Sequence, residues 1–296
     1  MKWAFLLVAN LFAFNAMSQM RTIQGQIIDE YEKGIPFAVV QAKEQNIGVY
    51  CDSNGEFSLR INTDSIKRII FYCMGYNRRE IAVKDIPDGK IHIKLQEENI
   101  KLDEVAVKWK KRKVREAILG KKNISNKEDP FNLGANGKYG DEYAIFLKAD
   151  LSRHSILKNV FVFVTDEGIP TTKFRMHVYD KDSATWMPLH DITDSNIIIH
   201  ADHGNEWVKV DLSNKQIPVN DGVFISIEWV SGYGNDSSIR QSTPVAYANG
   251  QVIGMTEGYN NMGFISVERL RFTDKWITMG MPFNLEIYGT YTYVKK

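Results

Sequence analysis

The stretch from residue 24 to residue 107 is interrupted every few residues by glycine, proline or an Asn-Gly pair, and this spacing limits the possible folds most. Between the interruptions lie short runs in which apolar and polar residues alternate, such as Ile-His-Ile-Lys-Leu at residues 91–95. Alternation with a period of two is typical of β-strands. Asn54 and Gly55 suit a two-residue hairpin, because both tolerate positive φ. The stretch is therefore predicted to be an all-β sandwich of about seven strands.

Five short motifs give this stretch a family resemblance. They lie at residues 25–29, 34–40, 48–59, 74–76 and 102–107, and the last begins with Leu-Asp-Glu-Val. With them the stretch resembles the carboxypeptidase-regulatory-like domain, a transthyretin-like (prealbumin-like) module that also stands at the front of TonB-dependent outer-membrane receptors. The resemblance implies a seven-stranded sandwich without an active site. Such receptors continue into a plug and a large barrel, for which too few residues follow, so a transporter is not expected.

The second half of the chain is also expected to be all-β. It contains about eight strand-like runs, and none of its segments keeps helical spacing over about ten residues. Eight strands in about 150 residues suit a jelly-roll sandwich. The order of its strand motifs, including residues 174–179, 207–213 and 222–229, is similar to the C-terminal part of exported carboxypeptidase-regulatory-like proteins of Gram-negative bacteria. It is more distantly similar to galactose-binding-like and carbohydrate-binding jelly rolls, which implies a fold but no particular ligand.

The first residues predict export. Lys2 precedes an apolar run at residues 3–14, which is too short to span a bilayer but suits the core of a signal peptide. Ala16 and Ser18 are small residues at the positions that a signal peptidase reads. Residues 1–18 are therefore predicted to be a signal peptide, and the mature protein to be in the periplasm, the outer membrane or on the cell surface. No later apolar run approaches the roughly 20 residues that a membrane helix needs.

Composition and residue order predict two domains joined by a linker. A chain of 296 residues with 44% hydrophobic residues can form two cores. The predicted parts are a sandwich at residues 20–107, a basic and polar linker at 108–140 and a jelly roll at 141–296. The linker begins with a basic run and a helix-compatible piece at residues 114–119; it is either solvated or a peripheral tether to anionic lipid or polysaccharide. A net charge of +1 argues against a nucleic-acid partner.

The chain has two cysteines, Cys51 and Cys73, both in the first predicted domain. An oxidising compartment permits a disulfide between them if their Cα atoms lie within about 7 Å. The other interpretation is two separate, half-buried thiols on strands. Neither cysteine is expected to be catalytic, because no nearby His or helix start would lower its pKa.

The sharpest enzymatic candidate is the H-x-x-E spacing of His203 and Glu206, which zinc carboxypeptidases use for two metal ligands. A catalytic zinc site takes three protein ligands, and in that family the third is a His far downstream, whereas no His follows His203 here. His200 is the remaining substitute. A zinc metallohydrolase at His200, His203 and Glu206 is thus kept only as a weak alternative. No enzyme activity and no cofactor are predicted.

Binding is the favoured function class. Aromatic rings can stack against sugars, and loop amides and hydroxyls can bind sugar hydroxyl groups. Trp207 and Trp229 lie in strand patterns and are predicted to be core residues. The candidate ligand-binding residues are Trp186, Tyr233, Asn235, Asp236, Tyr247 and Tyr259. The sequence thus predicts a non-catalytic exported binding or scaffolding protein of the bacterial envelope, with a glycan or an envelope protein as partner; the alternatives are a carbohydrate-binding accessory protein and an edge strand that pairs with a partner.

Overall fold

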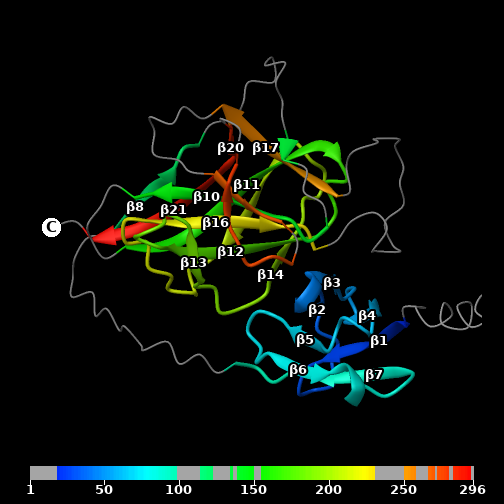
Figure 1. Ribbon diagram of the computed structural model, residues 1–296. Helices are drawn as coiled ribbons and strands as arrows, with labels where there is room; N and C mark the ends of the chain where they lie inside the picture. The colour runs from blue at the N-terminus through cyan, green and yellow to red at the C-terminus, as the bar shows by residue number, and fades with distance from the viewer. Residues whose placement is uncertain are drawn as a thin grey trace, which may run out of the picture. The chain divides into compact units, whose positions relative to one another are not determined.

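The computed structural model describes residues 19–98, 114–122, 134–135, 139–149, 155–230, 250–257, 266–270, 272–279 and 283–294. In these residues the regular structure is almost entirely strand (Figure 1). The chain divides into two units: unit 1 consists of Met1–Tyr72 and Arg78–Leu95, and unit 2 of Cys73–Asn77 and Gln96–Lys296. No helix of the described residues is long and apolar enough to cross a membrane. The predicted signal peptide lies outside the described residues.

Unit 1 is a sandwich of seven strands, as predicted. The strands are β1 (Met20–Ile28), β2 (Val39–Ala42), β3 (Ile47–Tyr50), β4 (Glu56–Asn62), β5 (Arg68–Tyr72), β6 (Arg79–Ala82) and β7 (Lys90–Lys94), with short 3-10 turns η1 (Lys43–Gln45) and η2 (Val83–Asp85). They form a three-stranded sheet, β4-β1-β7, and a four-stranded sheet, β3-β2-β5-β6. β1 runs parallel to β7 and antiparallel to β4.

The alternation in β4 shows why this sequence forms a half-buried strand. Phe57, Leu59 and Ile61 are buried, whereas the residues between them are exposed. Successive side chains of a strand point to opposite faces, so one face of β4 lines the core. Phe57 meets Phe71 of the other sheet edge to face, with ring centroids 5.8 Å apart. This contact packs the two sheets against each other in the core of unit 1.

The turn at Asn54 and Gly55 is not the predicted hairpin. β3 and β4, which it joins, belong to different sheets, so the turn crosses from one sheet to the other. Only Gly55 of the pair has positive φ, 79°, and a Cβ there would lie 2.5 Å from the carbonyl oxygen of Ile27. The Asp52 carboxylate holds the turn by accepting the backbone N–H groups of Asn54, at 2.8 Å, and of Glu56, at 2.9 Å. Asp52 thus has a structural role as an Asx turn.

Cys51 and Cys73 are both buried and are not bridged. The residues just before them, Tyr50 and Tyr72, pair with the same residue, Val39, from opposite sides of β2. Two interstrand steps of about 4.8 Å therefore separate the cysteines, which places their Cα atoms roughly 10 Å apart. A disulfide requires less than about 7 Å. The bridge considered from the sequence is not formed, because β2 lies between the two positions.

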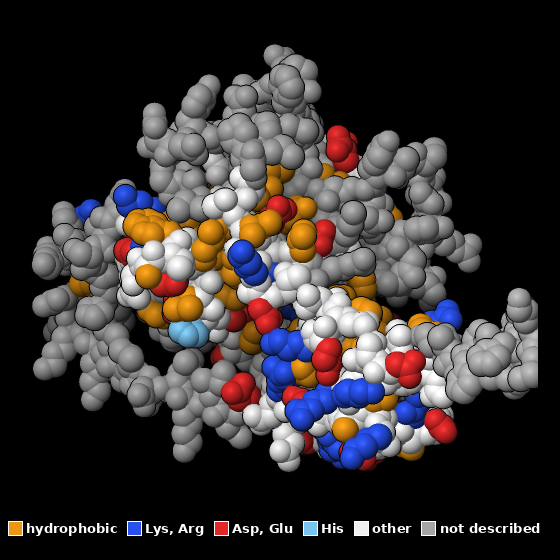
Figure 2. Space-filling view, viewed as in Figure 1, with side chains coloured by type: hydrophobic (Ala, Val, Ile, Leu, Met, Phe, Trp, Pro, Cys, Tyr) orange, Lys and Arg blue, Asp and Glu red, His pale blue; other side chains and the backbone are white. Residues whose placement is uncertain are grey.

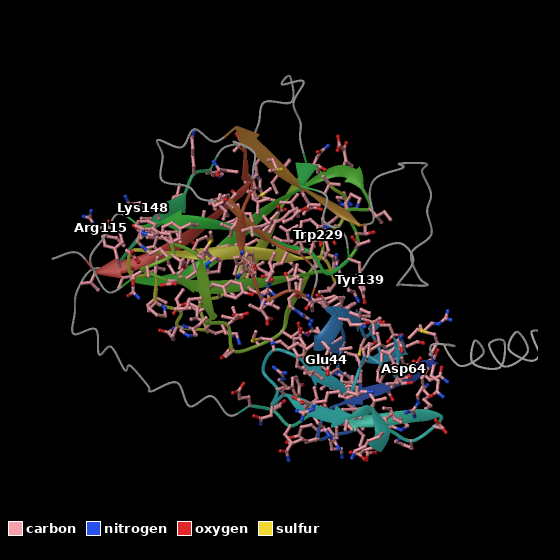
Figure 3. All side chains as sticks on the ribbon, viewed as in Figure 1. Glu44, Asp64, Arg115, Tyr139, Lys148 and Trp229 are labelled. Carbon is pink, nitrogen blue, oxygen red and sulfur yellow. The ribbon has the colours of Figure 1, made fainter. Side chains whose placement is uncertain are left out.

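Unit 2 is the second sandwich and matches the predicted jelly roll. Its first sheet has the order β13-β12-β16-β10-β18-β19, with β14 also on β12; its second has the order β20-β17-β11-β21-β8, with β15 on β11 and β9 on β17. The strands are β8 (Val114–Gly120), β9 (Gly134–Ala135), β10 (Glu142–Lys148), β11 (Ser155–Gly168), β12 (Phe174–Lys181), β13 (Pro188–Asp191), β14 (Ile197–Ile199), β15 (Glu206–Asp211), β16 (Gly222–Glu228), β17 (Gln251–Glu257), β18 (Ser266–Arg269), β19 (Ile277–Thr278), β20 (Phe283–Leu285) and β21 (Ile287–Val294). Trp229, which is 1% exposed, lies in the core of this unit (Figure 3).

One predicted linker segment is instead part of unit 2. Val114–Gly120 forms strand β8, which pairs with the last strand, β21, from Val114 opposite Val294 to Gly120 opposite Tyr288. Leu119 of this strand is fully buried in the core. The expectation of a helix-compatible piece is therefore wrong at residues 114–119. The reason is non-local: the partner strand lies at the opposite end of the sequence.

Candidate functional site

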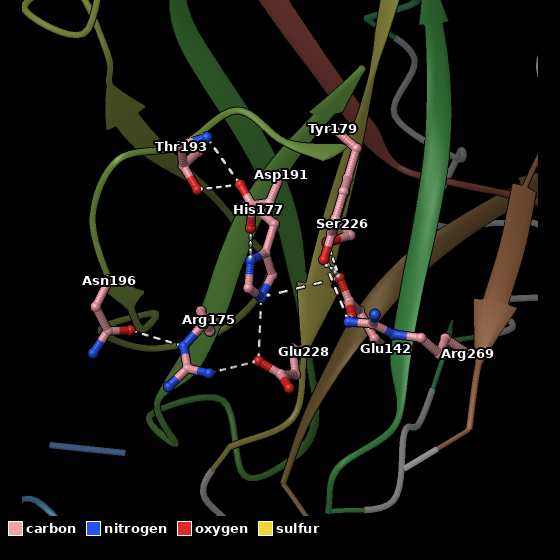
Figure 4. A network of polar contacts seen from close by, with 10 residues as sticks. All are labelled: Glu142, Arg175, His177, Tyr179, Asp191, Thr193, Asn196, Ser226, Glu228 and Arg269. Atoms are coloured by element: carbon pink, nitrogen blue, oxygen red, sulfur yellow. Dashed lines mark hydrogen bonds and ion pairs between the residues drawn. The ribbon is translucent and has the colours of Figure 1, made fainter. Parts of the chain in front are cut away.

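A network of ionisable side chains lies on one face of the first sheet of unit 2 (Figure 4). In β12, Met176 and Val178 point into the core, so Arg175, His177 and Tyr179 point to the opposite face. The neighbouring strands add further residues to this face. Those from β16 are Ser226 and Glu228, and those from β10 and β18 are Glu142 and Arg269.

His177 is the centre of this polar network. Its Nδ1 lies 2.5 Å from the Asp191 carboxylate, and its Nε2 lies 3.2 Å from Oε2 of Glu228 and 4.0 Å from Oε1 of Glu142. Burial by itself lowers the pKa of His177, but the charges of Glu142 and Asp191 and the hydrogen bonds that the ring donates to Asp191 and Glu228 raise it to about 10. At neutral pH the ring is therefore an imidazolium, and both ring nitrogens donate.

The two glutamates are held by further partners. Glu228 accepts a hydrogen bond of 2.9 Å from Arg175. Glu142 accepts hydrogen bonds from Tyr179, at 2.9 Å, and from Ser226, at 2.5 Å, and forms an ion pair with Arg269.

The remaining members complete the network. Arg175 donates to Asn196 through Nε, at 2.7 Å, and Asp191 accepts the backbone N–H and the hydroxyl group of Thr193. Burial and the adjacent carboxylate of Glu142 raise the pKa of Tyr179, so its hydroxyl group remains a donor. Buried carboxylates thus face two guanidinium groups and one imidazolium, an arrangement in which the charges compensate one another.

Glu142, His177 and Glu228 form the one group of three metal-ligating side chains among the described residues, with their ligand atoms within 4.8 Å of one another. The oxygens nearest His177 are already used. Oε1 of Glu142 accepts two hydroxyl groups, and Oε2 of Glu228 accepts a guanidinium N–H group. A metal ion would have to displace those bonds and the proton of His177. The arrangement therefore fits a structural network of charges better than a metal centre.

Sequence reasoning did not single out this network, although a signal was present. The alternate positions 175, 177 and 179 carry Arg, His and Tyr in an otherwise apolar strand, and positions 226 and 228 carry Ser and Glu. Polar residues at every second position of a strand whose other face is apolar indicate a polar face. Which of them meet depends on the register between β12, β16 and β10, which is a tertiary property.

The weak zinc candidates do not come together. His200, His203 and Glu206 all lie in the described region but form no cluster with ligand atoms within 4.8 Å. Oε1 of Glu206 instead accepts the backbone N–H groups of Asp202, at 2.7 Å, and His203, at 2.8 Å. The hydrogen bond from the His203 backbone lowers the pKa of Glu206 most. Glu206 therefore stabilises its own loop as a carboxylate.

Trp186, one of the candidate ligand-binding residues, is exposed. Its side chain is 52% exposed, its φ is 61°, and the Nζ of Lys181 lies 3.9 Å from its ring centroid. The loop is held by Asp182, whose carboxylate accepts the Ala184 N–H group and the Thr185 hydroxyl. The other candidate ligand-binding residues lie outside the described residues; they are Tyr233, Asn235, Asp236, Tyr247 and Tyr259.

Trp207 and Trp229, both predicted to be core residues, differ in the structure. Trp229 is in the core and donates from Nε1 to the carbonyl group of Gln251, at 3.0 Å. Trp207 is partly exposed and lies on the opposite face of its strand from Val210, a core residue. The sequence already shows this difference, because Trp207 alternates in phase with Lys209 and Asp211 rather than with the apolar positions.

Unit 1 carries a basic surface (Figure 2), in which Lys and Arg side chains gather over β6 and β7. A pocket of 860 Å³ in this unit is lined by residues that include Arg21, Lys67, Arg68 and Lys84. Arg21 is fully engaged, since it donates to the carbonyl groups of η2 and the following turn, and Arg68 pairs with Glu80 at 2.8 Å. Exposed ion pairs of this kind contribute little to stability.

Comparison with known proteins identifies the first domain. Residues 23–107 match the family model of the CarboxypepD_reg-like domain, which confirms the resemblance seen in the sequence. No curated protein matches the chain. Among solved structures, the cysteine protease and lectin-like domains of Cwp84, a surface layer associated protein of Clostridium difficile, are similar with a TM-score of 0.30 and 12% identity, over 53% of this chain and 32% of that one. The chain thus spans about a third of that relative.

A second solved structure covers more of the chain at a lower score. BcpA, the major pilin subunit of Bacillus cereus, matches with a TM-score of 0.19 and 11% identity, over 90% of this chain and 69% of that one. Scores this low carry no conclusion about the function of this chain. What the comparisons establish is the identity of the domain at residues 23–107.

Proposed function

With residues 23–107 forming a CarboxypepD_reg-like domain and a second β-sandwich following it, we propose that the chain is a non-catalytic, exported binding or scaffolding protein of the bacterial envelope. The observation that carries this proposal is the polar network of unit 2. Its charged groups pair with one another: His177 with Asp191 and Glu228, and Arg269 with Glu142. Such a network makes the sandwich rigid and specific in its packing.

The protonation states support a structural role for this network. A general base must be able to take up a proton near the working pH, whereas His177, with a pKa of about 10, already carries both protons. Tyr179 keeps its proton, because burial and Glu142 raise its pKa. A catalytic metal needs an open coordination position, and the nearest oxygens of Glu142 and Glu228 are occupied by hydrogen bonds.

Export is supported by the character of the first 18 residues, a cationic start followed by an apolar run and small residues. Cell fractionation tests it directly. The protein detected with an antibody should be in the periplasmic or outer-membrane fraction and should begin at Gln19 by N-terminal sequencing. Recovery of the full-length protein from the cytoplasm would contradict export.

Binding is tested with the purified mature protein and isolated envelope material. Outer membranes and cell-wall polysaccharide stripped of protein are each mixed with the protein and sedimented. We expect co-sedimentation with at least one of the two, and equal co-sedimentation of a His177→Gln variant that remains folded, because the network is structural. If the native protein hydrolysed envelope material and the folded His177→Gln variant did not, the proposal would be overturned. The absence of binding to both materials would also overturn it.

A carbohydrate ligand is the second candidate, and the exposure of Trp186 favours it. A Trp with positive φ is uncommon and is maintained only where the surrounding structure holds it. Lys181 lies over one face of the ring. If Trp186 is a sugar-stacking residue, its change to alanine should reduce binding to a defined oligosaccharide array at least tenfold without a change in thermal stability. An unchanged binding pattern would remove Trp186 from the site.

A further inference from the structure

The second sheet of unit 2 carries an aromatic cluster on the face that points away from the core. In β11, Val160, Val162 and Val164 are buried in the core, so Phe161 and Phe163 point to the other side. Phe163 pairs with Trp207 of β15, and Phe161 pairs with Tyr288 of β21. Phe161, Phe163, Trp207 and Tyr288 together form an aromatic face.

The rings of the aromatic face contact one another closely. Phe161 stacks on Tyr288 with centroids 4.5 Å apart and an angle of 4° between the planes. Trp207 meets Tyr288 edge to face at 4.9 Å and lies 5.3 Å from Phe163. Phe161, Phe163 and Trp207 are partly exposed. The outer face of an antiparallel sheet is normally polar, and grouped, partly exposed aromatic rings mark a binding surface.

A polar atom at the same place indicates the kind of ligand. Nε1 of Trp207 is buried and has no hydrogen-bond partner within the described part of the chain. Buried donors in native proteins nearly always have a partner, and a tryptophan N–H can only donate. The missing partner is therefore an acceptor such as a hydroxyl oxygen. A purely apolar ligand, such as a lipid chain, would leave this donor unsatisfied.

A carboxylate lies in the same row of the sheet. The backbone N–H of Phe163 donates to the carbonyl of Glu286 at 3.0 Å, which places Glu286 beside Phe163. The Glu286 side chain is buried, and its Oε2 lies 2.5 Å from the position that a Cβ on Gly254 would take. Glycine at 254 thus leaves room for the carboxylate next to the ring of Phe163. Phe163 therefore lies between Trp207 on one side and Glu286 on the other.

From this arrangement we infer that the aromatic face binds an oligosaccharide of neutral pyranose units. The C–H faces of the sugar rings pack on Phe161, Phe163 and Trp207, and the Nε1 of Trp207 donates to a sugar oxygen. Sites of this kind combine apolar contact with a few polar groups that fix orientation. The inference rests on the proposed binding function and assigns its ligand class and its place, which is distinct from the exposed Trp186.

The test uses the mature protein labelled with 15N in its tryptophan side chains. Soluble oligosaccharides of β-linked glucose, β-linked galactose and N-acetylglucosamine are titrated separately while the indole N–H signals are followed by NMR. The signal that disappears in Trp207→Phe identifies Trp207. With at least one of the three saccharides that signal should shift, whereas the signal of Trp229, whose Nε1 is already bonded within the core, should not.

Affinity measurements with the same saccharide complete the test. We expect Trp207→Ala to weaken binding at least tenfold and Trp207→Phe, which keeps a ring but loses the donor, to weaken it less. Tyr31→Ala, which removes an exposed aromatic side chain from unit 1, is the control and should bind as the native protein does. Circular dichroism and thermal unfolding show whether each variant is folded, and Phe161→Thr provides a second variant, on a different strand, if Trp207→Ala does not fold.

Each contrary outcome is informative in a different way. If a saccharide binds but neither Trp207→Ala nor Phe161→Thr weakens binding, the site lies elsewhere and the proposed binding function stands. If none of the three saccharides shifts the Trp207 signal, the aromatic face is not a site for neutral sugars. Co-sedimentation with outer membranes or cell-wall material then decides separately whether the protein binds the envelope.

Discussion

The protonation state of His177 leads to a quantitative prediction about stability. Its pKa rises from 6.5 to about 10 on folding, and each unit corresponds to about 1.4 kcal/mol. The folded state therefore binds a proton more tightly than the unfolded chain, a contribution of roughly 5 kcal/mol. Because the folded pKa is the higher one, this contribution is complete below about pH 6.5 and is lost as the pH rises through about 10.

The assay compares the native protein with His177→Gln between pH 7 and pH 9. Urea unfolding of unit 2 can be followed by the fluorescence of its tryptophans, among them the buried Trp229. Over this range the native protein should lose about 2 to 3 kcal/mol more unfolding free energy than the variant, since linkage removes about 1.4 kcal/mol per pH unit between the two pKa values.

Comparison with the variant also cancels the contributions of titrating groups that the two proteins share. Cysteine, tyrosine and lysine side chains ionise in or near the same pH range, but they are the same in both proteins. The difference between the two pH profiles therefore reports His177 together with its coupling to the carboxylates it faces. Identical profiles for the native protein and the variant would show that the folded imidazole is neutral, and the interpretation of the network as paired charges would be wrong.

Three further predictions concern the two sandwiches. Gly55→Ala should destabilise unit 1 by more than about 2 kcal/mol in urea unfolding, because the added Cβ would clash with the backbone. The control Gly89→Ala, also at positive φ but with open space around it, should cost about 1 kcal/mol. Equal effects of the two changes would show that the close approach of the backbone to Gly55 does not matter for stability. Alkylation in denaturant without a reductant, followed by mass spectrometry, should modify both Cys51 and Cys73, since the bridge is not formed; an unmodified, linked pair would contradict this. Leu119→Ala should cost about 2 to 5 kcal/mol in the unfolding of unit 2, and an unchanged midpoint would exclude β8 from its core.

The fold of unit 1 could be predicted from its sequence because its signals are local. The alternation of Phe57, Leu59 and Ile61 determines which face of β4 is buried, and Asp52 organises a turn within four residues of itself. The prediction of a hairpin at Asn54 and Gly55 is wrong, because β3 and β4 belong to different sheets. Asn54 and Gly55 satisfy the sequence rule for a hairpin, but whether the two strands they join pair with each other depends on the rest of the sandwich.

In unit 2 the strands could be predicted, but most of the functional arrangement could not. Trp207 alternates in phase with the polar residues Lys209 and Asp211, and this pattern indicates a position on the outer face rather than in the core. Residues 114–120 could not be assigned from local pattern, because their partner is β21 at the other end of the chain.

By itself, the sequence determined the β-class of both halves, the family of residues 23–107 and the alternation that gives each strand an apolar and a polar face. Only the tertiary structure decided which polar residues share a face and at what distance, as for His177 with Glu228 and for Trp207 with Phe163. The physical reason is that alternation is a property of one strand, whereas register and sheet order come from packing between strands distant in sequence.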